Sequence, residues 1–126
     1  MILIFGGAYQ GKLAYALERF GLADDQVYHC SAEDVAVPCK QKVIYGIERW
    51  ILALIRADAD LAQQLERFMR ENPDAAVICS DISCGVVPID DTLRKWREET
   101  GRALIKLAEQ SEEVVRLFCG IPTKVK

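Results

Sequence analysis

The sequence lacks an excess of basic residues and a long hydrophobic run, and each absence excludes a class of protein. Its 126 residues include 16 lysines and arginines interspersed with 19 acidic residues, which gives a net charge of −3. Nucleic acid is therefore a poor candidate for a partner, because binding it needs a basic surface. The N-terminal apolar run MILIF ends at two glycines, far short of the ~20 residues that span a bilayer. We expect no membrane span and a cytoplasmic location.

Histidine and paired cysteines are also scarce. His29 is the single histidine, and the five cysteines are irregularly spaced without a C-x-x-C pair. This pattern does not fit a zinc site, which needs clustered cysteine and histidine ligands. We expect reduced, mostly buried thiols, and a packed or half-exposed His29 without a catalytic role.

The chain has no internal repeat, no low-complexity tract and no linker rich in proline, glycine and serine. Its composition is 51% hydrophobic and 28% charged, which suits a globular protein with one core. A single domain over residues 1–126 is predicted.

Short apolar runs alternate with stretches of helical periodicity. Strands are predicted at 1–5, 26–30, 75–79 and 114–119. Helices are predicted at 13–20, from 44 to 71 as one helix or two with a break near 57–60, and from about 88–91 to 110. This alternation predicts an α/β three-layer domain with a parallel sheet, because parallel strands need crossover connections. Trp50 and Trp96 lie on apolar helix faces and are expected in the core.

The stretch FGGAYQGKL carries the clearest chemical signal. From Gly6 to Leu13, seven of eight residues fit G-x-x-x-x-G-K-[ST], the phosphate-binding loop (P-loop) of nucleotide enzymes. The loop follows an apolar strand and precedes a helix, so its glycines can turn backbone N–H groups toward a phosphate while Lys12 supplies a cation. The candidate nucleotide-binding residues are Gly6, Gly7, Ala8, Tyr9, Gln10, Gly11, Lys12 and Leu13, and Lys12 is also a candidate catalytic residue.

The loop departs from the motif at the residue that normally ligates Mg²⁺. Leu13 replaces the serine or threonine and cannot bind a metal, a loss that weakens catalysis more than it weakens anion binding. Asp81, directly after the apolar strand at 75–79, is the candidate catalytic and metal-site carboxylate. A capping role or plain solvent exposure explains Asp81 equally well. Glu48 is a weaker candidate and is better explained as a solvated helix residue.

Three stretches match one protein family in order and spacing. They read GGAYQGK, AAVICSDISCGVVP and WREETGRALIKLAEQSEEVVRLFCGIPTKVK. In the adenosylcobinamide kinase / adenosylcobinamide-phosphate guanylyltransferase family of cobalamin biosynthesis, the corresponding stretches read approximately GGARSGKS, NEVGxGIVP after a strand, FRDxxGxxNQxLA and ADEVxLVVSGIP. The chain resembles this family as a short, divergent member. The matching residues are Gly6, Gly7, Ala8, Gly11, Lys12, Asp81 (for the Glu of NEVG), Gly85, Val87, Pro88, Arg97, Glu98, Gly101, Gly120, Ile121 and Pro122.

The resemblance implies a RecA-like P-loop fold, GTP or ATP as ligand, a corrinoid substrate and a homotrimer. Departures from the family are Leu13, Ser80 for Asn, Ser83 for Gly, and Leu104 and Ile105 for the N-Q pair. The family's segment with the histidine that accepts the guanylyl group has no counterpart here, and His29 lies too early in the chain to replace it. We therefore expect guanylyl transfer to be lost.

Three functions stay open at this point. The first is a nucleotide-binding kinase that transfers a phosphoryl group to a corrinoid hydroxyl with Mg²⁺, using Lys12 and Asp81. The second is a degenerate, non-catalytic binding or regulatory module with the same fold. The third is a small-molecule kinase outside the corrinoid pathway.

Overall fold

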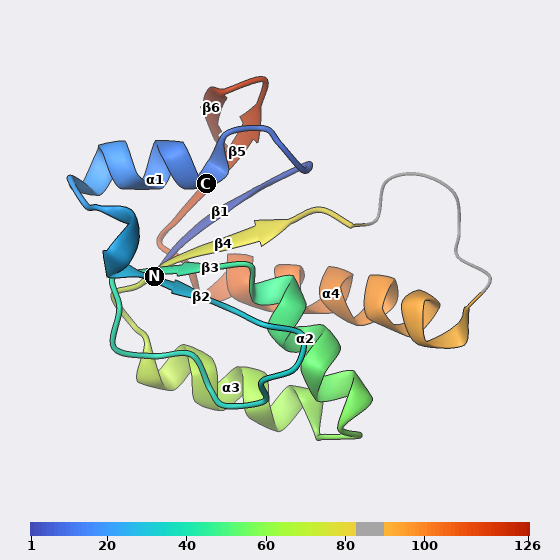
Figure 1. Cartoon of the computed structure of the whole chain (residues 1–126). Coiled ribbons are helices and arrows are strands. Elements are labelled where there is room, and N and C mark those ends of the chain that lie inside the picture. The colour runs from blue at the N-terminus through green and yellow to red at the C-terminus, as the bar shows by residue number, and fades with distance from the viewer. Residues whose placement is uncertain (83–89) are drawn as a thin grey trace.

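The structure, a computed structural model, describes residues 1–82 and 90–126 (Figure 1). The elements in chain order are β1 (Ile2–Gly6), α1 (Lys12–Phe20), the 3-10 helix η1 (Asp24–Gln26), β2 (Val27–His29), β3 (Val43–Tyr45), α2 (Ile47–Arg56), α3 (Leu61–Glu71), β4 (Ala76–Ser80), α4 (Asp91–Gln110), β5 (Glu113–Phe118) and β6 (Ile121–Lys124). Within the described residues, no helix combines the length and apolar character needed to cross a membrane.

The strands form one sheet in the order β2-β3-β4-β1-β5-β6. All neighbouring pairs are parallel except β5 and β6, which form an antiparallel hairpin. Helix α1 covers one face of the sheet, and α2, α3 and α4 cover the other (Figure 1). The α/β class with a mostly parallel sheet is thus confirmed, and the arrangement is compatible with a P-loop-like fold.

The sheet divides the hydrophobic core into two clusters because successive strand residues point to opposite faces. Leu3 of β1 packs in the cluster under α2, α3 and α4, whereas the next residue, Ile4, packs under α1 with Ala16. Trp50 lies in the larger cluster, with its ring centroid 5.5 Å from that of Phe68.

The predicted break in the long helical region is confirmed. Helix α2 ends at Arg56, and Asp60 begins α3 by accepting a hydrogen bond from the Gln63 N–H at 3.1 Å. At the other end of α3, the buried Asn72 amide donates to the Pro38 and Phe68 carbonyl oxygens, both at 2.9 Å. Asn72 thereby links the irregular segment at 31–42 to helix α3 by side-chain hydrogen bonds.

Two strands differ from the prediction. Residues 43–45 form β3, so the prediction of helix from residue 44 is wrong there, because pairing with β2 and β4 outweighs the helical spacing of the apolar residues. Strand β6 was not predicted at all. It is an exposed edge strand whose hydrogen bonds to β5 form it, and it contains Pro122.

The tryptophan, cysteine and histidine expectations have mixed outcomes. Trp50 is buried, but Trp96 is only half-buried and donates its Nε1–H to the Glu48 carbonyl oxygen at 2.7 Å, which joins α4 to α2. His29 is half-exposed, as predicted. Among the described cysteines, which are all free thiols, Cys30 and Cys79 are buried, Cys39 is half-buried and Cys119 is exposed. Cys84 lies outside the described residues.

We predict that Gly6→Ala destabilises the protein by about 1–3 kcal/mol, because the added Cβ would lie 2.4 Å from the backbone oxygen of Leu117. Gly101→Ala in α4 is the matched control: nothing lies within 4 Å of its added Cβ, and alanine favours a helix by about 0.5–1 kcal/mol. Urea unfolding measures both changes. Equal stability of the two variants would contradict the close packing of β1 against β5.

Candidate functional site

The segment between β1 and α1 is a tight loop over the carboxyl edge of the sheet. Gly11 precedes α1 in a left-handed conformation (φ 89°, ψ 20°), and Tyr9 also has a positive φ of 60°. Within the described residues, no side chain caps the N-terminus of α1. Its first backbone N–H groups therefore remain available to an anion, and the helix dipole favours negative charge there.

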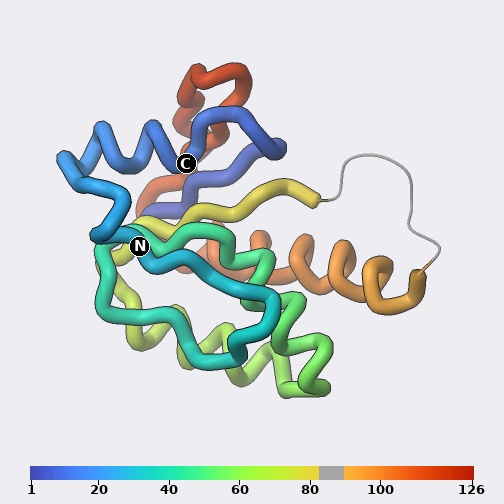
Figure 2. Tube along the Cα trace, viewed as in Figure 1, coloured from blue at the N-terminus to red at the C-terminus, as the bar shows by residue number. Residues whose placement is uncertain are grey.

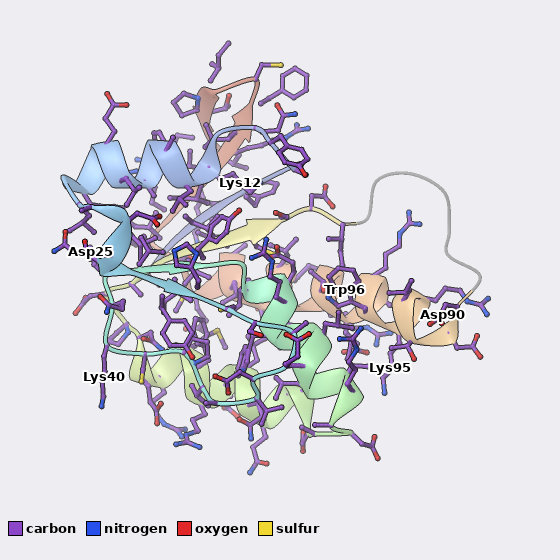
Figure 3. The ribbon with its side chains drawn as sticks, viewed as in Figure 1. Lys12, Asp25, Lys40, Asp90, Lys95 and Trp96 are labelled. Atoms are coloured by element: carbon purple, nitrogen blue, oxygen red, sulfur yellow. The ribbon has the colours of Figure 1, made fainter. Side chains whose placement is uncertain are left out.

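Lys12 lies buried inside this loop, with 5% of its surface exposed (Figure 3). Its Nζ donates a hydrogen bond to the Gly7 carbonyl oxygen at 2.6 Å. Burial lowers the pKa of Lys12, while the negative charge of Glu48 opposes that shift. The loop thus encloses the Lys12 ammonium group, which is hydrogen-bonded to the loop's own backbone.

Glu48 is a buried residue of the site, and its prediction as a solvated helix residue is wrong. Only 5% of its surface is exposed, and its Oε2 accepts the Ser80 N–H at 3.2 Å. Burial together with the Glu48 charge raises the pKa of Cys30 to about 12 and that of Cys79 well above its ordinary value. Helical spacing failed here because both the sheet and α4 pack against α2, which buries Glu48 along with most of the helix and leaves Arg49 and Arg56 exposed.

Ser80 and Asp81 stand at the end of β4, directly beside the loop. The Asp81 N–H donates to the Gly6 carbonyl oxygen at 2.8 Å, and Ser80 pairs with Gly6 in the sheet. Asp81 is half-buried. The backbone of Asp81 is therefore adjacent to the first glycine of the loop, although Asp81 is not among the residues that line the loop cavity described below. The matched family positions Gly85, Val87 and Pro88, and also Ser83, lie outside the described residues.

Leu13 makes apolar contacts at the position where it departs from the motif. Its side chain is half-buried and packs against the hydrophobic cluster beneath α1. It therefore contributes apolar contact where the motif has a metal-binding hydroxyl.

The β5–β6 turn holds the loop from the opposite side to β4. The Gln10 side chain accepts the Cys119 N–H through Oε1, and its carbonyl oxygen accepts the Gly120 N–H at 3.0 Å. Figure 2 shows this hairpin beside the segment that follows β1. The loop is thus anchored by residues more than a hundred positions away in the chain.

A cavity of about 300 Å³ opens at the loop. It is lined by residues 8–14 of the loop and the start of α1, by Tyr45 and Ser80 at the ends of β3 and β4, and by Arg49 in the first turn of α2. The structure thus brings the predicted residues from Ala8 to Leu13 to one cavity. Gly6 and Gly7 do not line it: Gly6 belongs to β1, and Gly7 accepts the Lys12 bond.

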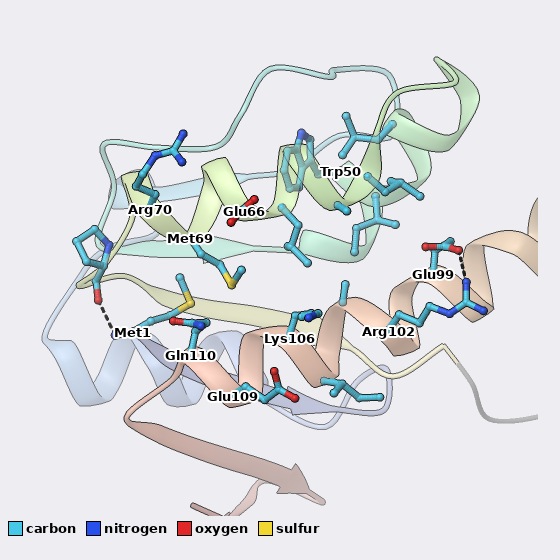
Figure 4. A pocket seen from close by; sticks show the side chains of 18 residues that line it. Met1, Trp50, Glu66, Met69, Arg70, Glu99, Arg102, Lys106, Glu109 and Gln110 are labelled. Carbon is cyan, nitrogen blue, oxygen red and sulfur yellow. Dashed lines mark hydrogen bonds and ion pairs between the residues drawn. The ribbon is translucent and has the colours of Figure 1, made fainter.

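Tyr45 and Arg49 were missed by sequence reasoning, because the β3–α2 junction was assigned to a helix. Gly46 between them was the available signal: it has a φ of 82° and begins α2. A larger cavity of about 840 Å³ lies among α2, α3 and α4 (Figure 4). Its walls are mainly apolar, and no residue of the P-loop lines it.

We predict that Glu48→Gln lowers the pKa of Lys12 further, because the variant removes a negative charge that favours the ammonium form and keeps an oxygen for the Ser80 N–H. Titration of the lysine side-chain NMR signals, assigned with Lys12→Met, measures the change. Because the folded pKa of Lys12 lies below 10.5, charged Lys12 opposes folding, and this effect fades as the pH rises through the folded pKa.

The exposed Glu66 provides the control, since Glu66→Gln should leave the signal of Lys12 unchanged. An unchanged pKa of Lys12 in Glu48→Gln would contradict the electrostatic contact between α2 and the loop.

A comparison with protein-family models finds one described as cobinamide kinase / cobinamide phosphate guanyltransferase, which matches residues 40–125. Curated proteins give no match. The matched range covers more than half of the chain and includes Tyr45, Glu48, Arg49 and Asp81, but it begins after the P-loop. The family carries out kinase and transferase chemistry in cobalamin biosynthesis and binds nucleotides. The chain belongs to the cobinamide kinase / cobinamide phosphate guanyltransferase family.

Proposed function

We propose that the chain binds the phosphates of ATP or GTP in the loop from Gly6 to Leu13 and transfers the terminal phosphoryl group to a hydroxyl of a corrinoid. The observation that supports this most strongly is the buried Lys12 ammonium inside a glycine loop, at a helix end without a side-chain cap. A RecA-like relationship and a trimeric assembly, both implied by the resemblance, are part of the same proposal.

The chain's own groups supply phosphate binding and charge stabilisation. The backbone N–H groups at the start of α1 and the Lys12 ammonium hold the phosphates, and a phosphate charge next to Lys12 favours its protonated form. Phosphoryl transfer needs little covalent help from the protein, so positioning and electrostatic stabilisation account for most of the catalysis.

The residues present fit Mg²⁺ only if the nucleotide shares in binding it. Among residues 1–82 and 90–126, no group of three or more His, Cys, Asp and Glu side chains forms a metal site. Mg²⁺ commonly uses one or two carboxylates together with substrate phosphates and water. Asp81, at the strand end beside Gly6, is the residue we propose to hold a water of the metal, and Mg²⁺ would supply charge neutralisation on the phosphates.

We also propose that guanylyl transfer is lost. The Nε2 of His29 lies 3.6 Å from Asp24 Oδ1, and its ring meets the edge of the Tyr45 ring at a centroid distance of 5.6 Å. His29 does not line the loop cavity. These contacts fit a structural histidine at the sheet edge better than an acceptor of a nucleotidyl group.

We predict that isothermal titration calorimetry detects ATP or GTP binding to the wild-type protein, and that Lys12→Met weakens it at least about tenfold, because a charge-assisted contact to phosphate is lost. Lys106→Ala on the exposed face of α4 is the control for general charge effects. Thermal unfolding checks that Lys12→Met is folded. Absence of binding of both nucleotides to the wild type, with and without Mg²⁺, would disprove the proposed function.

A second function is supported by Leu13, whose packing under α1 replaces a metal ligand. This observation favours a non-catalytic module that binds nucleotide without turning it over. Release of ADP or GDP in the presence of cobinamide distinguishes the two. Turnover establishes the kinase, whereas binding without turnover, unchanged in Leu13→Ser, supports the module.

A further inference from the structure

Arg49 is a surface arginine that lines the loop cavity. It comes from the first turn of α2, and Lys12 comes from the first turn of α1. Because α1 and α2 cover opposite faces of the sheet (Figure 1), these two cations approach the cavity from two sides. Neither the matching motif nor the resemblance assigns any role to Arg49.

The Arg49 side chain is held over the β3–α2 junction. Its guanidinium carbon lies 5.4 Å from the centre of the Tyr45 ring, which also lines the cavity. A Cβ built on Gly46 would lie 3.5 Å from Arg49 Cδ and 3.6 Å from its Nε, so the side chain is folded back over the start of the helix. The stacking contact with Tyr45 and the close fit over Gly46 preorganise the guanidinium beside the cavity.

The charge of Arg49 has no carboxylate partner in the described part of the chain. The ion pairs within 4.0 Å among residues 1–82 and 90–126 do not include it. Arg67 and Arg102 pair with glutamates on their own helices, whereas Arg56 and Arg70 are exposed without an ion pair in the described residues, as Arg49 is. Arg49 differs from Arg56 and Arg70 in that it lines the loop cavity. An arginine fixed at a cavity without such a partner is suited to an anionic ligand, because its planar fork can donate two hydrogen bonds to one phosphate.

We propose that Arg49 is a second phosphate-binding residue, which contacts the terminal phosphate of the bound nucleotide while Tyr45 supports its guanidinium. This inference rests on the proposed function. The terminal phosphate is the one concerned because the inner phosphates are held by the loop and the α1 N-terminus. Arg49 instead reaches the cavity from the start of α2, which follows β3, and β4 separates β3 from β1.

The test is calorimetric binding of ATP and GTP, and of ADP and GDP, to the wild type and to Arg49→Ala. We expect Arg49→Ala to weaken triphosphate binding about tenfold or more and to change diphosphate binding less than about twofold. Arg49→Lys should recover only part of the loss, because lysine lacks the planar fork. Tyr45→Leu should weaken triphosphate binding less than Arg49→Ala does, since it removes only the aromatic ring that stacks with the Arg49 guanidinium.

Arg56→Ala is the matched control, because Arg56 is an exposed arginine at the opposite end of the same helix. It should bind all four nucleotides as the wild type does. Triphosphate binding unchanged by Arg49→Ala, or triphosphate and diphosphate binding weakened equally, would overturn the inference and leave the proposed function intact. Absence of any nucleotide binding to the wild type would overturn both.

Discussion

The close backbone packing at the end of β1 is the constraint on which the site depends. Gly6 lies between β4 and β5, and the space for a side chain is filled by the Leu117 carbonyl oxygen at 2.4 Å from where a Cβ would be. Its own carbonyl oxygen accepts the Asp81 N–H. This packing fixes the direction in which the chain leaves the sheet. The loop, the start of α1 and the end of β4 are therefore positioned together.

This packing leaves two charged side chains buried near the end of β1. Lys12 and Glu48 are each 5% exposed, and burying an ion is costly unless polar groups or an opposite charge compensate it. The Gly7 carbonyl oxygen stabilises the ammonium, and the Ser80 N–H stabilises the carboxylate. The negative charge of Glu48 also favours protonated Lys12. The protein thus keeps a cation inside the loop in a largely water-excluded position, where an anion would interact with it strongly.

The segments that match the family model are in direct contact with the glycine loop, although the match begins at residue 40, after the loop. Matched segments hold the loop from two sides: β4 through Asp81, and the β5–β6 turn through its contacts with Gln10. The cavity likewise combines loop residues with Tyr45, Arg49 and Ser80 from the matched range. Membership of a nucleotide-binding family and the geometry of the glycine loop therefore support the same proposal from different parts of the chain.

Local sequence pattern was sufficient for most elements: the strands β1, β2, β4 and β5, the helices α1 and α4, the helix break before Asp60, and the loop that joins β1 to α1. The signals for these elements depend on periodicity, capping and glycine conformation, which act over a few residues. Tertiary contacts decided the remainder. Residues 43–45 continue a helical spacing and become a strand only through pairing with β2 and β4, and β6 forms only against β5. Glu48 is buried because the sheet and α4 pack against α2. Arg49 reaches the loop cavity because the pairing of β3 with β4 brings the start of α2 to the same edge of the sheet as the loop, and no local pattern encodes either arrangement.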